Sequence, residues 1–569
     1  MVMQVKDVVD SCTTLKSSWQ VRNNKMKDWY NILRLEDKLA QKGMETVTAN
    51  DPKTGYLLGK HLLTSSTVAH KIEIEELDPT EIAGTSYLEK FMTRRWVAEE
   101  NRYRRMGRQS FKGQLLGFML ATGWYAAFSM VTEDRIWTEV MNPYDVYPKF
   151  GPAGIDEAAH IYELGKLTAM RKCKLMGWNT PPRLPAKVAI YNYWFYDSDG
   201  DIANGIVMDR YFVKEPVKDV ALNNLIQKLG EPMFPIFMSP VGGLPDEGSI
   251  LQSPTEWQKN FGESIVATNE SLTNNYNKML SFAQHATRGA AQHRWYEKVA
   301  GDYHILKEED MDKWGAIFSM GPNDEIGALT PPQIPVELRT IMFEYTNMLQ
   351  RGLFPAALHG NIQQQMSFLA MANVASSAIQ ILTPFRDNYV GLMSDLNNYH
   401  YNMMKVNGYR PHNFKMPEVL PDEFAFQVQA DIEIPGFLIQ RATIARMLDP
   451  TFRLPTRMVM DKFFPEIKDP IGAIAESRKD EAMMHPKAIL ADAVIAYKEH
   501  ARRLKEAGQS EAGALYDKLA ASTEAEIVGG PVQPRGGGNL AAQAAEASVI
   551  NEAFPGGAAQ RPQEGMGQV

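Results

Sequence analysis

The stretch from residue 331 to 401 constrains the fold most, because two helical patterns in it flank a loop. After Pro335, apolar side chains recur at helical spacing and predict an amphipathic helix that ends at Gly352. A loop follows over residues 353–365. A longer helical pattern then extends from Met366 to about Tyr401, and Pro384 predicts a kink in it. This order is typical of a mechanical element that positions a loop.

Length and composition indicate a globular chain of several structural units. The 569 residues exceed the usual size of one hydrophobic core, so we expect two to four units. The net charge of -8 argues against a protein that coats DNA through basic surfaces, although a protein can surround DNA without gripping it. Two cysteines, Cys12 and Cys173, exclude a disulfide framework and favour a reducing compartment. The sequence contains no run of eighteen apolar residues, so we expect no membrane span.

The rest of the chain predicts an α+β fold that is mainly helical. The expected helices are 11–42, 78–131 with a break near 105–107, 254–284, 437–448, 455–463, 470–483, 486–507 and 509–525. The expected extended segments are 71–75, 136–147 around an Asn-Pro turn, 186–196, 205–213 and 424–434. We expect a small α/β insertion over residues 286–330. The Gly- and Ala-rich tail, 529–569, is expected to be disordered.

Two charged segments have both a functional and a structural interpretation. Six arginines could contact phosphate, but a solvated helix face paired with Glu99 and Glu100 is the favoured interpretation. These are Arg94, Arg95, Arg102, Arg104, Arg105 and Arg108. The turn Asp197-Ser198-Asp199-Gly200-Asp201 resembles the start of a calcium loop. Ile202 and Met208 stand where that loop needs glycine and glutamate, so a polar hairpin turn is favoured.

The sequence shows no recognisable catalytic motif. It lacks a phosphate-binding Walker loop, a Gly-x-Ser-x-Gly elbow and a His-Glu-x-x-His pair. The histidines near residue 290 have no partners at metal-ligand spacing, and His359 has no evident partner for base catalysis. We therefore expect no enzyme activity, no cofactor and no metal site.

Three local segments and the order of elements resemble the portal proteins of tailed double-stranded DNA bacteriophages. The segments are Asn142-Pro143-Tyr144-Asp145-Val146-Tyr147-Pro148, Gln350-Arg351-Gly352-Leu353-Phe354-Pro355, and 367–378. The resemblance covers roughly residues 20–525. It implies a virion protein, made in the host cytoplasm, that forms a homo-oligomeric ring, typically of twelve subunits, at one capsid vertex. Its implied partners are non-specific duplex DNA, the terminase large subunit, a head–tail adaptor, and the major capsid and scaffold proteins, with no membrane.

The resemblance also assigns parts of the chain to the portal domains. The wing is 1–253 and 366–435, the stem helices are 254–285 and 335–352, the clip is 286–334, the tunnel loop is 353–365, the crown is 436–528 and the loose tail is 529–569. The implied clip docking surface is Arg288, His293, Arg294, Trp295 and Trp314. The implied channel residues are His359, Asn361, Gln363, Gln364 and Gln365. Residues 354–365 contain no lysine or arginine, which favours a steric collar over an electrostatic clamp.

Two alternatives to a portal remain open from the sequence. One is another head–tail connector or scaffold protein of the virion. The other is a soluble hydrolase that uses His359 or the acidic turn at Asp197, Asp199 and Asp201.

Overall fold

The chain separates into two units, Met1–Asp469 and Pro470–Val569, which are described one at a time. The structure is a computed structural model. The residues it describes are 3–39, 46–73, 79–151, 154–230, 233–244, 262–291, 294–302, 304–305, 319–329, 336–354, 379–421, 424–432, 459–460, 473–474, 476–479, 483, 485–506 and 509–528.

Two helices replace the single helix predicted over residues 11–42. They are α1 (Val5–Ser18) and α2 (Gln20–Leu33), and the chain turns between them at Trp19. The Trp19 indole donates a hydrogen bond to the Pro148 carbonyl at 2.6 Å, which fixes the turn against the sheet region. The fully buried Arg22 side chain lies over the rings of Trp19 and Trp124, at 4.7 and 5.1 Å. Its Nη2 donates to the Val146 carbonyl at 2.9 Å.

The predicted long helix over 78–131 is two helices followed by a strand. The helices are α4 (Pro79–Arg105) and α5 (Phe111–Thr122), so the predicted break is present. The prediction is wrong after Thr122, because Gly123 adopts φ 68° and ends the helix. The next eight residues form β2 (Trp124–Val131), which has a partner strand on each side. A short apolar run at the end of a helix does not by itself distinguish helix from buried strand.

Two antiparallel sheets organise the N-terminal half of the first unit. The smaller has the order β3-β2-β9, with β3 (Ile136–Val140) and β9 (Ile236–Pro240) beside β2. The larger runs in sequence order through β4 (Val146–Gly151), β5 (Gly154–Gly165), β6 (Lys187–Tyr196), β7 (Ile202–Met208) and β8 (Tyr211–Lys218). The predicted Asn-Pro turn is the 3-10 turn Pro143–Asp145, where the Asn142 side chain accepts from the Tyr144 N–H at 3.2 Å. The predicted hairpin around Asp197 is confirmed.

Further helices cover these sheets and connect distant parts of the chain. They include α3 (Asp51–Ser65), α6 (Lys166–Met176) and α7 (Val220–Leu229). The strands β1 (Thr67–Glu73) and β12 (Ala425–Asp431) pair antiparallel across more than 350 residues of sequence. They correspond to the predicted extended segments 71–75 and 424–434, with shifted ends.

The long helix α12 (Thr383–Asn407) runs through the core and buries most of one face. Pro384 is its second residue, after the 3-10 turn Gln380–Leu382. Residues 366–378 of the predicted helix lie outside the described residues, so the kink stays a prediction. The helix continues six residues beyond the predicted end at Tyr401. The Asn397 side chain connects the core elements: it accepts from the Trp96 indole at 2.8 Å and contacts His70 Nδ1 at 2.9 Å.

The second unit contains two described helices, α16 (Pro486–Glu506) and α17 (Ser510–Val528). They are antiparallel, because Lys498 pairs with Glu524 and Lys505 pairs with Asp517. Both helices were predicted, with ends within three residues. The predicted helices 437–448 and 455–463 and the tail lie wholly or largely outside the described residues. Within the described part of the chain, no helix is long and apolar enough to span a bilayer. The fold class, α+β and mainly helical, is confirmed.

Candidate interaction surface

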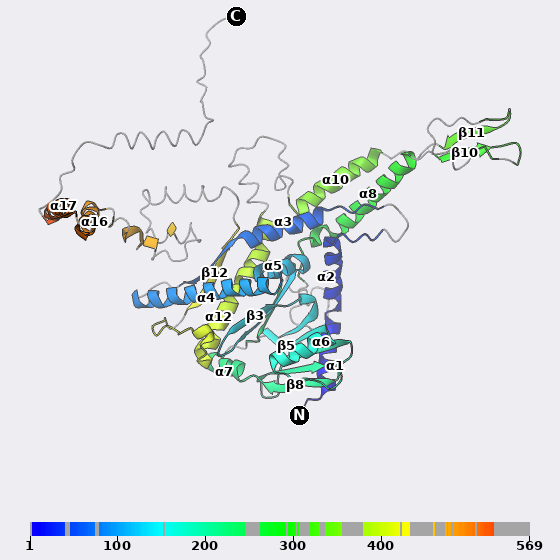
Figure 1. Cartoon of the computed structure of the whole chain (residues 1–569). Coiled ribbons are helices and arrows are strands. Elements are labelled where there is room, and N and C mark those ends of the chain that lie inside the picture. The colour runs from blue at the N-terminus through cyan, green and yellow to red at the C-terminus, as the bar shows by residue number, and fades with distance from the viewer. Residues whose placement is uncertain are drawn as a thin grey trace, which may run out of the picture. The chain divides into compact units, whose positions relative to one another are not determined.

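Two antiparallel helices lead from the sheets to a small β-hairpin (Figure 1). They are α8 (Glu270–Ala291) and α10 (Val336–Gly352). The Asn269 side chain, just before α8, donates to the Leu349 carbonyl at 2.9 Å, and Thr346 Oγ1 donates to the Tyr276 hydroxyl at 3.3 Å. The start of α8 therefore lies beside the end of α10. The helix predicted over 335–352 is confirmed.

The predicted helix over 254–284 is wrong over residues 262–269. Only Ala267–Asn269 is helical there, as a 3-10 turn, and α8 begins at Glu270. The preceding residues dock on the end of α5: Ser264 Oγ donates to the Leu120 carbonyl at 2.8 Å, and the Ile265 N–H donates to the same oxygen at 3.0 Å. Gly262 has φ 62° and approaches Gly123 so closely that a Cβ would collide with the Gly123 carbonyl. These contacts fix the base of the helix pair.

Gly352 fits the base of the helix pair for a different reason. Its φ is not positive, so it does not end the helix as a left-handed cap. A Cβ at this position would collide with Asn269 Oδ1. The absence of a side chain therefore makes room for the Asn269 amide, whose hydrogen bond connects the two helices.

The helix pair exposes large apolar side chains in the single chain. They are Phe282 on α8 and Ile341, Phe343 and Met348 on α10, with exposed fractions of 41–65%. One face of α8 is covered by an N-terminal segment, where the Val47 N–H donates to Ser281 Oγ at 3.0 Å and the Ala49 N–H to Asn277 Oδ1 at 2.9 Å. Exposed large apolar residues on more than one side of a helix pair indicate surfaces for another protein.

The hairpin between the helices has strands β10 (Arg294–Lys298) and β11 (Glu325–Leu329). The Glu297 carboxylate contacts His304 Nδ1 at 2.5 Å and accepts from the Ile305 N–H at 2.8 Å, so it holds the chain that leaves β10. Of the predicted docking residues, Arg288 is exposed in the last turn of α8, while Arg294 and Trp295 begin β10. His293 and Trp314 lie outside the described residues.

The first two residues of the predicted channel loop follow α10 outside any helix or strand. Leu353 and Phe354 are buried core residues, and Leu353 lies against Gly55 of α3. They anchor the end of α10 to the sheet-bearing part of the unit. The predicted channel residues themselves, His359, Asn361, Gln363, Gln364 and Gln365, lie outside the described residues.

The acidic turn is occupied by a lysine of this chain. Lys218 Nζ lies 3.1, 2.7 and 2.8 Å from carboxylate oxygens of Asp197, Asp199 and Asp201. These three contacts raise the pKa of Lys218. Its ammonium group supplies positive charge at the place where a calcium ion would supply it. The turn therefore fits the hairpin interpretation and gives no support to a hydrolytic carboxylate site.

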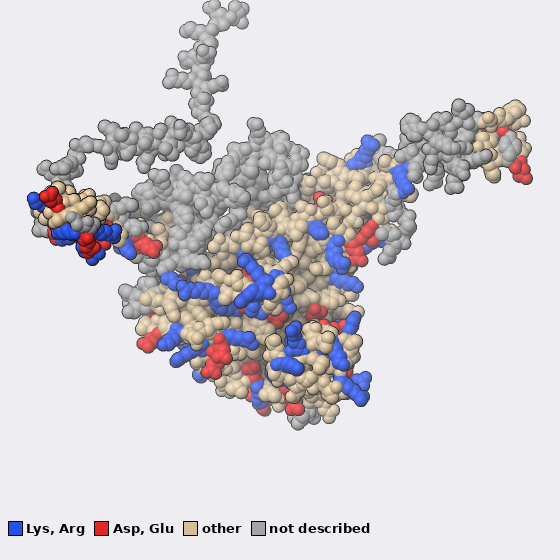
Figure 2. All heavy atoms as spheres, viewed as in Figure 1, with Lys and Arg blue, Asp and Glu red and all other residues tan. Residues whose placement is uncertain are grey.

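The six arginines of α4 and of the turn after it divide into structural and exposed groups. Arg95 is buried, stacks on the Trp96 ring at 3.7 Å and contacts Thr138 Oγ1. Arg102 pairs with Glu99 at 2.6 Å, whereas Arg108 pairs with Glu139 on β3 at 3.3 Å. Arg94, Arg104 and Arg105 are exposed, in a region where Figure 2 shows basic side chains close together. Glu100 accepts from the Lys112 N–H at 2.8 Å, and among the described residues it forms no ion pair with an arginine.

No protein-family model matches the chain. No curated protein matches it either.

Proposed function

We propose that this chain is the subunit of a phage portal ring, through which double-stranded DNA enters and leaves the capsid. The observation that carries the proposal is the helix pair α8/α10, which exposes Phe282, Ile341, Phe343 and Met348 and ends in a β-hairpin. In a portal, such a pair is the stem and the hairpin belongs to the clip.

In a ring, a neighbouring subunit can cover the apolar side chains that the helix pair exposes in the single chain. Apolar side chains on an exposed helix face are covered when the same face meets a different face of the next copy. Such a head-to-tail contact rotates each subunit relative to the one before it. The ring closes when a whole number of these rotations makes one full turn. The number of subunits follows from that rotation. A ring of twelve remains the expectation carried by the resemblance.

The charge distribution suits a channel in which DNA slides. The chain is acidic overall, at -8, and residues 354–365 carry polar amides and one histidine but no lysine or arginine. Each lysine or arginine on a phosphate adds salt-dependent affinity, which resists sliding. We propose that the segment after Phe354 is a steric collar around the duplex, without sequence readout.

The hairpin is the proposed docking site for the terminase motor and, later, for the tail adaptor. To test this, residues 292–335 are replaced by a short Gly/Ser linker that joins α8 to α10. The portal proposal predicts that the variant still forms rings but no longer captures the terminase large subunit, and that its capsids remain empty of DNA.

A matched variant controls for general damage. It carries a deletion of the tail 530–569, which should leave motor capture unchanged. If the linker variant captures the motor as well as the wild type, the hairpin is not the docking site. If rings form but neither motor capture nor DNA filling depends on the chain, another head–tail connector is the better assignment.

A further inference from the structure

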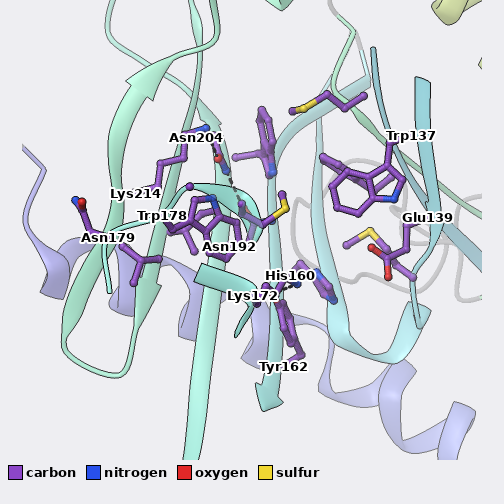
Figure 3. A pocket seen from close by; sticks show the side chains of 18 of the residues that line it. Trp137, Glu139, His160, Tyr162, Lys172, Trp178, Asn179, Asn192, Asn204 and Lys214 are labelled. Atoms are coloured by element: carbon purple, nitrogen blue, oxygen red, sulfur yellow. Dashed lines mark hydrogen bonds between the residues drawn. The ribbon is translucent and has the colours of Figure 1, made fainter. Parts of the chain in front are cut away.

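A cavity of about 560 Å³ lies between the two sheets of the first unit (Figure 3). Its walls come from β2, β3, β5, β6, β7 and β8, with α6 and the turn after it at one side. This volume is in the range of sites that hold a small organic molecule. Nothing in the proposed portal function uses it, since it lies in the sheet region rather than on the helix pair.

The cavity walls are strongly aromatic. Phe128 contacts Trp137 and Trp194 with ring centroids at 6.2 and 6.1 Å, and Figure 3 shows Trp137 across the cavity from Trp178. His160 lies 4.4 Å from the Tyr162 ring. Burial lowers the pKa of His160 to about 3, so this imidazole is neutral and adds a further flat, uncharged surface. Such walls favour a flat aromatic ligand.

Two lysines bring positive charge to this aromatic cavity. Lys172 Nζ donates to the Tyr162 hydroxyl at 2.6 Å, and Lys214 Nζ donates to Asn204 Oδ1 at 2.9 Å. Burial lowers the pKa of both ammonium groups. The charges of Glu139 and Asp219 offset part of this effect at Lys172 and Lys214, respectively, but among the described residues no ion pair joins either lysine to a carboxylate. Two partly desolvated cations that bond only to neutral oxygens favour an anionic ligand.

A buried donor in the same cavity lacks an acceptor. Trp194 is 1% exposed, and no acceptor among the described residues lies within hydrogen-bond distance of its Nε1. This Nε1 has almost no accessible surface, so it is not within reach of a ligand in the cavity, although Trp194 is one of the lining residues. Of the two carboxylates at the cavity, Glu139 pairs with Arg108, and Glu215 is exposed at the rim.

We propose that this cavity binds a small molecule made of a flat aromatic ring and one acidic group. The ring would lie among Trp137, Trp178 and Trp194, and the acidic group would accept hydrogen bonds from Lys172 and Lys214. An aromatic carboxylate and a nucleoside monophosphate share this chemistry. The proposal does not depend on ring formation.

Calorimetric titration of the full chain with 2-naphthoate, 2-naphthamide and adenosine monophosphate tests the proposal. We expect saturable binding of at least one anion, and about ten-fold or more weaker binding of the neutral amide than of naphthoate. Tighter binding of naphthoate assigns the site to carboxylates, and tighter binding of the monophosphate assigns it to nucleotides.

Variants locate the binding. Lys214→Met and Lys172→Met keep the aliphatic stem and should each weaken binding of the anion about ten-fold or more. The control is Lys187→Met, an exposed lysine on β6 outside the cavity, which should bind like the wild type. Thermal unfolding confirms that each variant is folded, and Lys214→Met carries the test if Lys172→Met is not.

Three results would overturn the proposal. The folded wild-type chain could bind neither anion at millimolar concentration. The amide could bind as tightly as naphthoate. The Lys187→Met control could lose as much affinity as the cavity variants.

Discussion

Removal of the Phe343 ring should impair assembly without affecting the folding of the single chain. Phe343 is 65% exposed on α10, so it contributes little to the core of its own chain. A phenylalanine side chain buries about 200 Å² when fully covered, so about 130 Å² is available to a neighbour. At about 25 cal/mol per Å², covering that area stabilises each contact between subunits by about 3 kcal/mol. Phe343→Ser should therefore weaken each contact roughly a hundred-fold.

Mass photometry across a dilution series measures this effect. We expect Phe343→Ser to shift the ring-to-monomer transition to much higher concentration, while its free energy of unfolding as a monomer stays within about 0.5 kcal/mol of wild type. The matched control is Leu167→Ser on α6, which removes an even more exposed apolar side chain away from the helix pair and should assemble normally. Equal assembly of Phe343→Ser and wild type would refute the interface on α10. Loss of assembly in both variants would show that the effect is not specific to that helix.

Four other predictions follow from contacts within the chain. Gly352→Ala should destabilise the first unit by about 1–3 kcal/mol in urea unfolding, since its Cβ displaces Asn269; a matched Gly391→Ala, which has open space, should not. Arg22→Ala should cost about 3 kcal/mol through the cavity and the unpaired carbonyls of Pro143 and Val146, and a neutral result would contradict this packing. Millimolar Ca²⁺ should not raise the melting temperature of the wild type, because Lys218 occupies the acidic turn; a clear rise would show that the lysine is displaced. Burial lowers the pKa of His400 in the folded chain well below its value in the unfolded chain. Below about pH 6.5 the unfolded chain therefore binds one more proton at this residue, and the free energy of unfolding should fall as the pH drops. His400→Gln should reduce the dependence of that free energy on pH by up to about 1.4 kcal/mol per pH unit, and an unchanged dependence would contradict this.

Patterns within one element were sufficient to predict several parts of the fold. The helix over 335–352, the Asn142-Pro143 turn and the hairpin around Asp197 each depend on spacing or turn chemistry inside a short segment. The strand after Gly123 and the extended segment at 262–266 depend on partners far away in the sequence. Apolar residues such as Phe128, Val131 and Ile265 suit a buried helix as well as an extended segment, so the sequence pattern alone assigned both segments to helices.

The candidate sites also depend on residues that are far apart in the sequence. Lys218 is the counterion of a turn that ends seventeen residues earlier, and no local motif links them. The cavity combines side chains from Phe128 to Glu215, which meet only when two sheets stack. Its aromatic residues looked like ordinary strand residues in the sequence. The apolar stripe of α10 that includes Ile341 and Met348 was visible in the sequence, but its exposure in the single chain required the structure. Phe343 lies outside that stripe, so its exposure was not predicted.

Imaging of the purified full-length chain by electron microscopy tests the central proposal most directly. At micromolar concentration and physiological salt, the portal account predicts closed rings of uniform subunit number, with a central hole wide enough for a DNA duplex. The α8/α10 pairs should line the contact between neighbouring subunits. A chain that remains a well-folded monomer across concentration and salt, with no ring, would contradict the account.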